Sequence, residues 1–503
     1  MRSSLTRCSW SVTGWREPRT GSRVSRARPT GRGRLHYRAR VSTSPDRRAF
    51  LGDLAERLPH GSVVTRAETL EGLRRDQTPI IEAGMPIAAV LPTSTEEVAM
   101  VLRLASEHRV PVVPRGAGSG LAGGANAIDG GIVLSLIRMD RIIEIDTDDL
   151  VVVCQPGVLN ATLAAEVTAR GLFYAPDPSS FEICSIGGNL ATNAGGLRCV
   201  KYGVTRESAL ALEVVLADGE VTRVGRRSVK SVAGYDLVGL FVGSEGTLGV
   251  ITEATLRLRP APLPAGTLLA TFDRLADAAT AVADITAAGV LPSVLELMDQ
   301  TTIRAVEEWR QLGLDTDAAA LLIARSDTAD FGRAELDAAQ TACRSAGATE
   351  ILRATDALEA EGLMDARRAA YPALERLGIA LLEDVAVPRG EIVRLVEAVE
   401  RIAAEHEIRI GTFGHVGDGN LHPTLVIPRG DAAAQARALE AADAILRETL
   451  ALGGTLTGEH GIGLLKRDLL ATELGAGGIR LSRAIKDALD PLGILNPGKA
   501  LPS

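Results

Sequence analysis

Apolar residues in the first half of the chain fall into helical repeats and short continuous runs. Residues 93–110 begin with capping residues and continue with apolar positions at helical spacing, so they predict a helix. The runs 131–137, 141–145 and 150–156 are rich in Val, Ile and Leu and predict strands. Residues 158–171 predict a second helix that a glycine ends. Together these elements predict an α+β domain.

A proline-rich stretch at residues 256–266 marks a boundary in this pattern. Beyond it, apolar runs at 267–272 and 319–327 alternate with helical spacing over 273–289 and 331–347. This alternation predicts a second domain, made of an antiparallel sheet with helices on one face. The expected fold class is therefore α+β, in two domains.

The composition is ordinary for a globular protein, with 46% hydrophobic and 23% charged residues among 503, a length that suits two or three domains. No apolar run approaches about 18 residues, so a spanning helix is not expected, although peripheral membrane contact through a partner stays open. The net charge of −8 gives no reason to expect nucleic acid. The five cysteines lack metal-type spacing and an iron–sulfur motif, which favours reduced thiols and a cytoplasmic location.

Residues 1–48 differ from the rest of the chain, because they hold 13 arginines and only two acidic residues. Such a leader can be an organellar transit peptide, a disordered arm or an over-extended reading frame, and these alternatives stay open. The RRAFL segment at 47–51 imitates a twin-arginine export signal, but no apolar stretch follows it. Export is therefore not expected.

A glycine-rich loop at residues 114–131 contains a formal G-x-G-x-x-G at Gly118, Gly120 and Gly123. A Rossmann-type dinucleotide site requires a helix that opens at the last glycines, whereas this loop continues into another strand. The sequence that follows these glycines therefore excludes a Rossmann-type site. The loop still offers backbone N–H groups that could wrap a diphosphate, because glycine lets the chain approach an anion closely.

Two further segments, residues 178–196 and 229–256, are rich in small residues with Asn and Ser or Thr among them. Each is typical of backbone that approaches a ligand, and also of a turn-dense surface loop. Three such segments in one domain favour a large cofactor over a lone phosphate.

The stretch GHVGDGNLHP predicts a hairpin, because its glycines exclude a helix interior and GDGN is a turn sequence. With residues 417–420 as the loop, His415 faces His422 across the strands, with Cβ atoms roughly 5 Å apart. Glu459 and His460 lie in a second glycine-rich segment, TGEHGIG. Two His and one carboxylate are a common open metal site, and these borderline ligands suit Zn, Mn, Fe or Co. The alternative is that the histidines are core or surface groups with ordinary partners.

The order of motifs along the chain resembles one protein family. The motifs are PRGAGSGLAGGA, IGGNLATNAGG, KYG, AGYDL, LFVGSEGTLGVITEATLRLRP, GHVGDGNLHP, TGEHGIG and NPGK. This set looks like the FAD-linked 2-hydroxyacid dehydrogenases, which include the flavin subunit of glycolate oxidase, D-lactate dehydrogenase and D-2-hydroxyglutarate dehydrogenase. They belong to the vanillyl-alcohol-oxidase-type flavoproteins. The resemblance runs from about residue 50 to the end of the chain.

The resemblance implies a two-part FAD-binding domain at 49–264, a substrate cap with the metal hairpin at 265–450, and a closing segment at 451–503 that returns to the FAD-binding domain. Non-covalent FAD is expected, because the loop at 114–127 has no histidine. The residues expected to bind FAD are Arg115, Gly116, Ala117, Gly118, Ser119, Gly120, Gly123, Gly124, Asn126, Pro178, Ser179, Gly187, Gly188, Asn189, Thr192, Asn193, Gly195, Gly196, Gly243, Glu245, Gly246, Gly249 and Ile251.

The resemblance also implies roles for the hairpin and the closing segment. His415, His422 and Glu459 would bind one divalent metal, and His460 would take the hydroxyl proton of a 2-hydroxy acid while hydride leaves for the flavin. His460 is not expected to be a ligand itself, since neighbouring residues of an extended segment point in opposite directions.

Arg367, in the segment DARRAAYPAL, resembles the family position that binds the substrate carboxylate, and Arg368 is the alternative. The 2-hydroxyglutarate members carry a Thr, a Lys and an Asn for the longer diacid, whereas this chain has Tyr371, Leu382 and Thr424 in those regions. A small D-2-hydroxy acid, glycolate or D-lactate, is therefore expected, with D-2-hydroxyglutarate as the alternative.

Several partners fit such a protein. The electron acceptor is a quinone, a cytochrome, an electron-transfer flavoprotein or an iron–sulfur subunit, and the chain forms a homodimer or joins a larger oxidase. Two other functions stay open. One is an ether-lipid-type alkyl transferase, which joins this FAD-binding domain to a related cap, and the other is a flavin-holding subunit of a glycolate oxidase without activity of its own.

Overall fold

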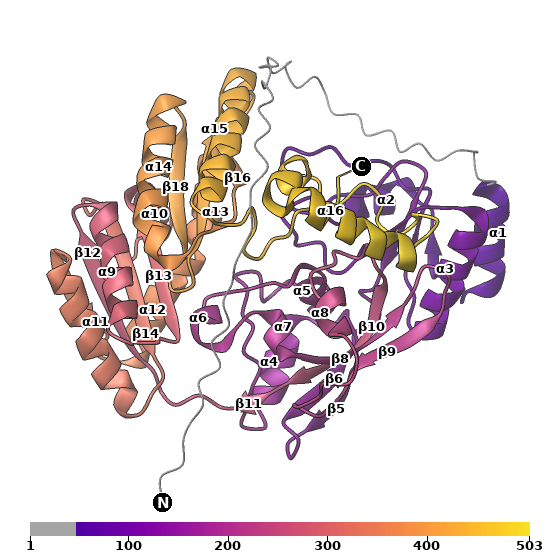
Figure 1. Ribbon diagram of the computed structural model, residues 1–503, viewed down its shortest axis with the longest axis horizontal. Coiled ribbons are helices and arrows are strands. Elements are labelled where there is room, and N and C mark those ends of the chain that lie inside the picture. Colours follow the sequence, from indigo (N-terminus) through magenta and orange to yellow (C-terminus); the bar gives the residue numbers. More distant parts are fainter. Residues whose placement is uncertain (1–46, 503) are drawn as a thin grey trace, which may run out of the picture. The chain divides into compact units, whose positions relative to one another are not determined.

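The computed structural model describes residues 47–502 (Figure 1). The leader expected over residues 1–48 lies outside the described residues except for Arg47 and Arg48, which begin helix α1 (Arg47–Arg57). Within the described part of the chain, no helix combines the length and apolar character needed to cross a membrane.

The half of the chain that is expected to bind FAD, named the FAD-binding half for this reason, has a first sheet that is small and mostly parallel. Its elements are β1 (Val63–Val64), α2 (Ala67–Leu73), β2 (Ala88–Val90), α3 (Thr95–His108), β3 (Val112–Arg115) and β4 (Ile132–Ser135). The strand order among the described residues is β1-β2-β4-β3, and β4 runs parallel to both its neighbours. Helix α3 covers this sheet and begins at the N-cap Ser94, whose side chain accepts from the Glu97 N–H, as the capping sequence predicts.

The second sheet is antiparallel. Its elements and connections are β5 (Ile142–Asp146), β6 (Val151–Cys154), α4 (Asn160–Thr168), β7 (Leu172–Phe173), α5 (Ile186–Thr192), α6 (Cys199–Tyr202), α7 (Thr205–Ser208), β8 (Ala209–Val215), β9 (Val221–Gly225), α8 (Leu237–Phe241), β10 (Val250–Arg257) and β11 (Arg259–Pro260). The order within residues 47–502 is β5-β6-β10-β8-β9, and one apolar core joins this sheet to α4, α5 and α8. The two sheets agree with the expected two-part architecture of this half of the chain.

The cap is built on one large antiparallel sheet. Its elements are β12 (Gly266–Phe272), α9 (Leu275–Ala287), β13 (Val294–Asp299), α10 (Gln300–Arg310), β14 (Ala320–Ser326), α11 (Arg333–Ser345), β15 (Glu350–Arg353), α12 (Ala357–Arg368), α13 (Ala370–Leu377), β16 (Ile379–Leu382), β17 (Val385–Ala386), α14 (Ile392–Glu405), β18 (Arg409–His415), β19 (Asn420–Ile427) and α15 (Ala432–Ala451). Over the described residues the order is β15-β12-β14-β13-β18-β19-β16, with β17 also paired to β19.

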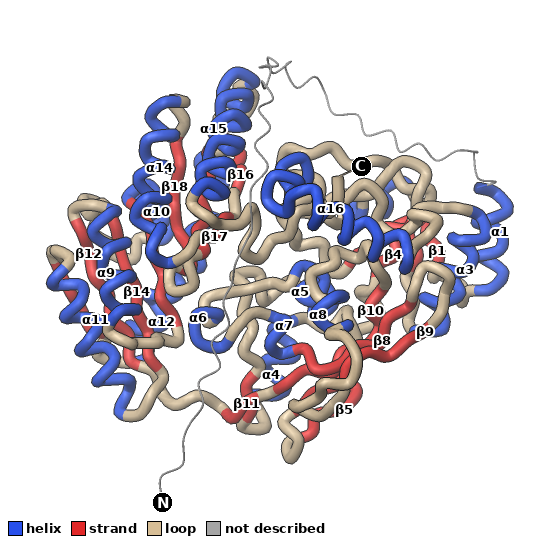
Figure 2. The backbone as a smooth tube through the Cα atoms, viewed as in Figure 1, coloured by secondary structure: helices blue, strands red, loops and turns tan. Residues whose placement is uncertain are grey.

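Helices cover both faces of the cap sheet, which corrects the prediction of helices on one face (Figure 2). One apolar cluster joins the sheet to α9, α11, α14 and α15, and a second cluster on the opposite face joins it to α10, α12 and α13. Both faces of these strands are buried, because successive residues of β12 and β13 are inaccessible and mostly apolar. Both faces therefore need a cover. The α+β class and the antiparallel cap are confirmed.

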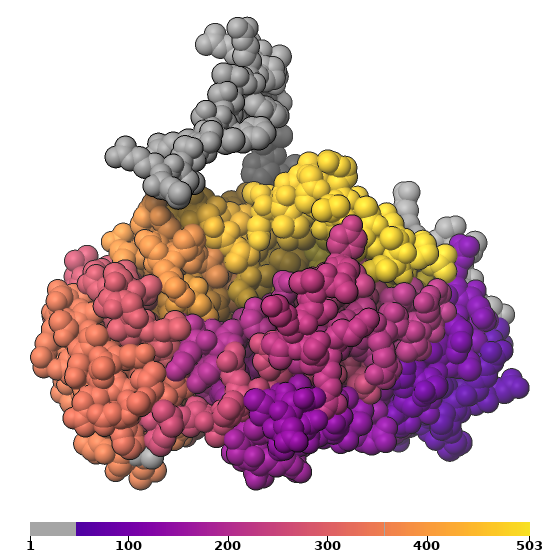
Figure 3. Space-filling view, turned by 60° about the horizontal axis from the view of Figure 1, so that its bottom comes forward, coloured from indigo at the N-terminus to yellow at the C-terminus, as the bar shows by residue number. Residues whose placement is uncertain are grey.

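The C-terminal segment, with helix α16 (Leu470–Leu489), contacts the first sheet again. The Val112 N–H donates to the carbonyl of Ile494, and the Asn496 N–H donates to the carbonyl of Val112, at 2.8 Å each. The Leu464 N–H donates to the carbonyl of Ala122 in the glycine-rich loop. This segment, yellow in Figure 3, therefore brings residues 457–463 to the FAD-binding half.

Candidate active site

A cavity of about 430 Å³ lies where the glycine-rich loops of the FAD-binding half meet the cap. A volume of this order suits a cofactor or substrate. The FAD-binding half contributes the loop after β3, residues of α5 and the turn before β10. The other wall consists of Arg367, Arg368, Tyr371, Pro372, Glu375, Leu382, Phe413, His422, Glu459 and His460.

Most residues predicted to bind FAD line this cavity. They are Arg115, Gly116, Ala117, Gly118, Ser119, Gly120, Gly124, Pro178, Ser179, Gly187, Gly188, Asn189, Thr192, Glu245, Gly246, Gly249 and Ile251. Gly118 has a φ of +78°, which a side chain would strain, and a Cβ there would meet the guanidinium of Arg115. No helix opens among the glycines of this loop, so the rejection of a Rossmann turn agrees with the structure.

Six predicted residues lie behind the cavity wall formed by the described residues. They are Gly123, Asn126, Asn193, Gly195, Gly196 and Gly243. Asn126 is buried and its side-chain oxygen accepts from the Asp76 N–H, while that of Asn193 accepts from the Arg206 N–H. Gly195 backs onto the carboxylate of Glu459, where a Cβ would come within 2.5 Å of Oε2. These residues shape the loops, and their predicted contact with FAD stays a prediction.

Unpaired polar atoms in this wall fit a ligand with the groups of FAD. Asp76 Oδ2, Arg115 Nη1 and Asn189 Nδ2 are buried without a hydrogen-bond partner among residues 47–502, and all three residues line the cavity. Ser185 joins two of the loops that line the cavity, because its Oγ accepts from the Ala117 N–H at 3.2 Å and from the Gly188 N–H at 3.3 Å. The sequence analysis missed Asp76, because a single acid 50 residues before Asn126 of the glycine-rich loop gives no signal on its own.

The predicted hairpin is present, with a different register. Strands β18 and β19 pair His415 with Asn420 and Phe413 with His422, so the two histidines are diagonal rather than opposite. The prediction placed the loop one residue late, because the strand β18 ends at His415 and the turn is 416–419. His415 and His422 still lie on the same face of the strand pair, and the centroids of their rings lie 5.2 Å apart.

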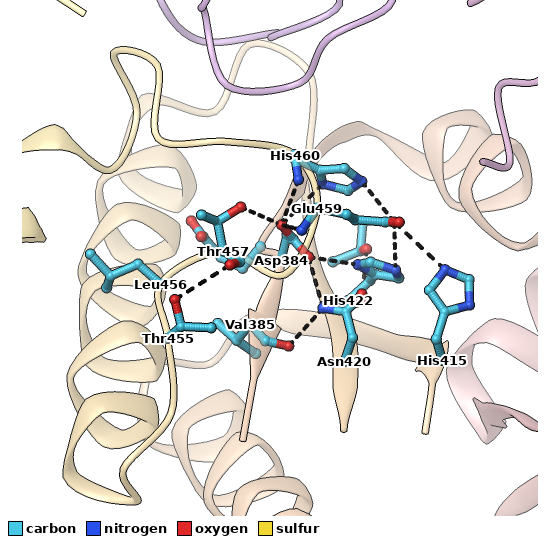
Figure 4. A network of polar contacts seen from close by, with 12 residues as sticks. Asp384, Val385, His415, Asn420, His422, Thr455, Leu456, Thr457, Glu459 and His460 are labelled. Atoms are coloured by element: carbon cyan, nitrogen blue, oxygen red, sulfur yellow. Dashed lines mark hydrogen bonds and ion pairs between the residues drawn. The ribbon is translucent and has the colours of Figure 1, made fainter. Parts of the chain in front are cut away.

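Three imidazoles converge on one carboxylate oxygen (Figure 4). The Nε2 atoms of His415, His422 and His460 lie 3.6, 3.4 and 3.3 Å from Oε1 of Glu459. Ligand atoms of His415, His422 and Glu459 all fall within 4.8 Å of one another, which fits the two-His, one-carboxylate set for a divalent cation.

The segment that carries Glu459 and His460 is a bend, and this corrects the argument from an extended segment. Asp384 shapes the bend, because its Oδ2 accepts from the N–H groups of Glu459 and His460, at 3.0 and 2.9 Å, and from the hydroxyl of Thr457. Both neighbouring side chains consequently turn toward the same cluster. His460 as a base rather than a ligand therefore stays a prediction, without its original geometric support.

The Nδ1 atoms of the histidines face buried carboxylates that the sequence reading missed. Nδ1 of His415 lies 2.6 Å from Oε1 of Glu296, while those of His422 and His460 lie 3.6 and 3.9 Å from the oxygens of Asp384. Carboxylates behind imidazoles commonly fix the tautomer that leaves Nε2 free for a metal. The available signal was an acid within an apolar run of the sequence, in VLELMD and LLEDVA.

Burial and the charges of neighbouring side chains together shift the pKa values of the residues in this cluster. Burial opposes the charged form of His415, yet the carboxylates of Glu296 and Glu459 raise its pKa well above the usual value. Burial also opposes ionisation of Glu459, but His415 and His460 hold its pKa well below the usual range. For His422 burial prevails and its pKa falls well below the usual value. Histidine and carboxylate ligands bind a divalent cation in their deprotonated forms, so metal binding here would release protons.

Arg367 is one of the largest fully buried side chains of the described residues. Its guanidinium lies over the ring of Phe413, 4.7 Å from the centroid, and its Nε lies 2.6 Å from Oε2 of Glu296. Its Nε and Nη2 both lack a hydrogen-bond partner within residues 47–502, so the contact with Glu296 is an ion pair without hydrogen-bond geometry, and the residue lines the cavity. Arg368 also lines the cavity but pairs with Asp365 at 3.1 Å. This favours Arg367 for an anionic ligand.

Two family profiles cover most of the described chain. The profile for the FAD binding domain matches residues 86–225, and that for the C-terminal domain of FAD linked oxidases matches residues 262–500. The glycolate oxidase subunit GlcD of Bacillus subtilis is 45% identical over 84% of this chain and 90% of its own length. The D-lactate dehydrogenase of Anaerostipes hadrus is 37% identical over 87% of this chain and 94% of its own.

Solved structures show the same fold at low identity. A structure of p-cresol methylhydroxylase with substrate bound aligns with a TM-score of 0.74 at 19% identity, over 90% of this chain and 97% of that one. An alkyldihydroxyacetonephosphate synthase aligns with a TM-score of 0.70, also at 19% identity, over 90% of this chain and 86% of that one. These likenesses show that the chain shares the fold of these two structures.

Proposed function

The chain belongs to the FAD-linked 2-hydroxyacid dehydrogenase family, and we propose that it oxidises a small D-2-hydroxy acid, glycolate or D-lactate, to the 2-oxo acid. Family membership makes the chain an FAD-dependent oxidoreductase. One observation supports the substrate class: the cavity lined by the FAD loops also exposes Arg367, Glu459 and His460. A cation for a carboxylate and a base for a hydroxyl are the groups that a 2-hydroxy acid requires.

Arg367 binds the substrate carboxylate in this proposal. Its guanidinium is buried, so an anion that reaches Nη2 gains a charge-assisted contact in a water-poor site. The Phe413 ring beneath the guanidinium restricts its position. The substrate is thereby oriented with its α-carbon toward the FAD loops on the other wall of the cavity.

His415, His422 and Glu459 would hold one divalent metal, of which Zn, Mn, Fe and Co all suit the ligands. A bound cation would acidify the substrate hydroxyl and compensate negative charge beside the carboxylate. The arrangement leaves the cavity side of the cluster open, because His422 and Glu459 line the cavity.

His460 accepts the hydroxyl proton at Nε2. Its side chain is 20% exposed and reaches the cavity, which a proton acceptor for a substrate requires. Bound FAD supplies the acceptor for the α-hydrogen and its electron pair. The C–O single bond becomes C=O as the O–H and C–H bonds break, so the two electrons lost by the acid are those gained by the flavin.

The wall near Arg367 favours a short substrate. Tyr371, Leu382 and Phe413 bring bulky side chains to this part of the cavity. Thr424, at the position where the resemblance places an Asn in the diacid-oxidising members, donates its hydroxyl hydrogen to the carbonyl of His422. Arg368 also lines the cavity and offers a second cation, and for this reason D-2-hydroxyglutarate remains the alternative substrate.

FAD is bound non-covalently in this proposal, and the electrons leave through a partner. A quinone, a cytochrome, an electron-transfer flavoprotein or an iron–sulfur subunit would accept them. The Bacillus subtilis relative is named as a subunit, which favours assembly into a larger oxidase over a homodimer. A cytoplasmic location, with membrane contact made through the partner, completes the proposal.

An anaerobic substrate panel tests the proposal. The purified FAD-loaded protein is mixed with glycolate, D-lactate, L-lactate and D-2-hydroxyglutarate, and the absorbance of oxidised flavin is followed. Bleaching by glycolate or D-lactate supports the proposal, and bleaching by D-2-hydroxyglutarate alone supports the alternative. A flavin that none of the acids reduces would leave a cofactor-holding subunit as the better account.

A further inference from the structure

We propose that Glu296 is a positioning residue that joins the metal site to the substrate-carboxylate site, an inference that rests on the proposed function. One buried carboxylate contacts both groups that would hold the two ends of the substrate. Its Oε1 lies 2.6 Å from Nδ1 of His415, and its Oε2 lies 2.6 Å from Nε of Arg367.

The fold brings the three residues together from distant parts of the chain. Glu296 lies in β13, whose next residue, Leu297, pairs with Gly414 of β18. His415 therefore follows as the cross-strand neighbour of Glu296, although 119 residues separate them in sequence. Arg367 reaches the same carboxylate from the end of α12.

Contact with Glu296 fixes the tautomer of His415. A carboxylate only accepts hydrogen bonds, so Nδ1 of His415 must carry the hydrogen. In the neutral form that binds a metal, Nε2 then carries the lone pair on the side of Glu459, 3.6 Å away. Ligand imidazoles with such a carboxylate partner bind metal more tightly, and loss of the partner typically costs about 10- to 100-fold in affinity.

Contact with Glu296 also sets the direction of Arg367. The ion pair holds the Nε edge of the guanidinium toward β13, and the ring of Phe413 covers one face. Nε and Oε2 of Glu296 are not aligned for a hydrogen bond, so this pairing is ionic, and Nη2, which is also buried without a hydrogen-bond partner within residues 47–502, remains for the anion in the cavity. A lone carboxylate inside an apolar sheet would be costly, but Glu296 meets a cation and an imidazole donor.

The test compares Glu296→Gln with wild type in three readouts. We expect metal affinity to fall about 10- to 100-fold in competition with a chromophoric chelator. We expect KM for the 2-hydroxy acid, and Kd for the 2-oxo acid from perturbation of the flavin spectrum, to rise by about tenfold or more, since a contact to a charged group is disturbed. At saturating metal, KM should change more than kcat.

Asp299→Ala is the matched control, because alanine removes a helix cap without touching the proposed site. Asp299 is also an acid of β13, but its side chain caps helix α10 by accepting from the Thr302 N–H at 2.8 Å. This variant should lower thermal stability and leave metal affinity and KM within about twofold of wild type. If Glu296→Gln does not fold, Glu296→Asp serves instead, because its shorter side chain cannot keep both contacts and should weaken both binding events.

The outcomes separate this inference from the proposed function. Metal affinity and 2-oxo acid Kd that both stay within about twofold of wild type would overturn the inference, as would a loss of one without the other. A variant that loses only thermal stability, like the control, would also overturn it. If no acid reduces wild-type flavin, the proposed function fails, whereas the metal and 2-oxo acid affinities still decide the role of Glu296.

Discussion

The Nε2 atom of His460 lies 3.3 Å from Oε1 of Glu459, although the two residues are neighbours in the chain. Adjacent side chains of an extended strand would point apart, but here the backbone bends around the buried carboxylate of Asp384. The carboxylate proposed for the metal and the imidazole proposed as the base consequently meet in one cluster at the cavity.

Substitution of His460 should slow flavin reduction while FAD and metal stay bound. His460→Gln removes the proton acceptor, and we expect flavin reduction by the 2-hydroxy acid to slow by about 10²- to 10⁴-fold. Stopped-flow absorbance, normalised to bound flavin and metal, gives this rate. A loss smaller than about threefold, or a loss that follows metal content, would show that His460 is structural or is itself a ligand.

The metal ligands should be separable from flavin binding. His415→Ala, His422→Ala and Glu459→Ala should each remove about one divalent metal per chain, because each deletes one member of the converging set. FAD should remain, since these side chains come from the cap hairpin and the C-terminal bend. Elemental analysis and flavin absorbance of the same samples measure both. Tight metal binding by the triple variant would contradict the site.

FAD should leave the polypeptide on denaturation. The loop at 114–127 has no histidine for a covalent flavin bond, and so acid or heat should release the yellow chromophore into the supernatant. Absorbance of the two fractions after centrifugation gives the answer. Flavin that stays with the precipitated protein would show a covalent bond.

Arg367 and Arg368 provide a matched pair for the carboxylate site. Arg367→Met should raise KM by about tenfold or more, because it removes a buried charge-assisted contact. Arg368→Met should change KM by less than about threefold for glycolate or D-lactate, since Arg368 pairs with Asp365. Initial rates across a range of acid concentrations measure both. The reverse order of effects would move the carboxylate site to Arg368.

Local signals in the sequence predicted the hairpin but not its register. The turn glycines place β18 and β19 together, whereas the pairing of His415 with Asn420 depends on where the strand ends within the whole sheet. The choice between Arg367 and Arg368 had only resemblance behind it, and burial now favours Arg367.

The carboxylates behind the histidines escaped the sequence reading for a physical reason. Glu296 and His415 are 119 residues apart, and Asp384 and His460 are 76 residues apart, so only tertiary contact joins them. Their local signal, an acid in an apolar strand, indicates a buried charge but does not name its partner. The helices on both faces of the cap sheet have a similar origin, because apolar runs do not say which element covers each side.

The central claim is that this chain oxidises a 2-hydroxy acid with the help of the metal cluster. The most direct measurement is a single-turnover flavin reduction by glycolate and by D-lactate under anaerobic conditions, with metal-loaded and chelator-stripped protein of equal FAD content. The account predicts that one of these acids bleaches the flavin of the metal-loaded protein, and that stripping slows the reaction at least about tenfold until metal is restored. Equal rates with and without metal, or no bleaching by any 2-hydroxy acid, would contradict it.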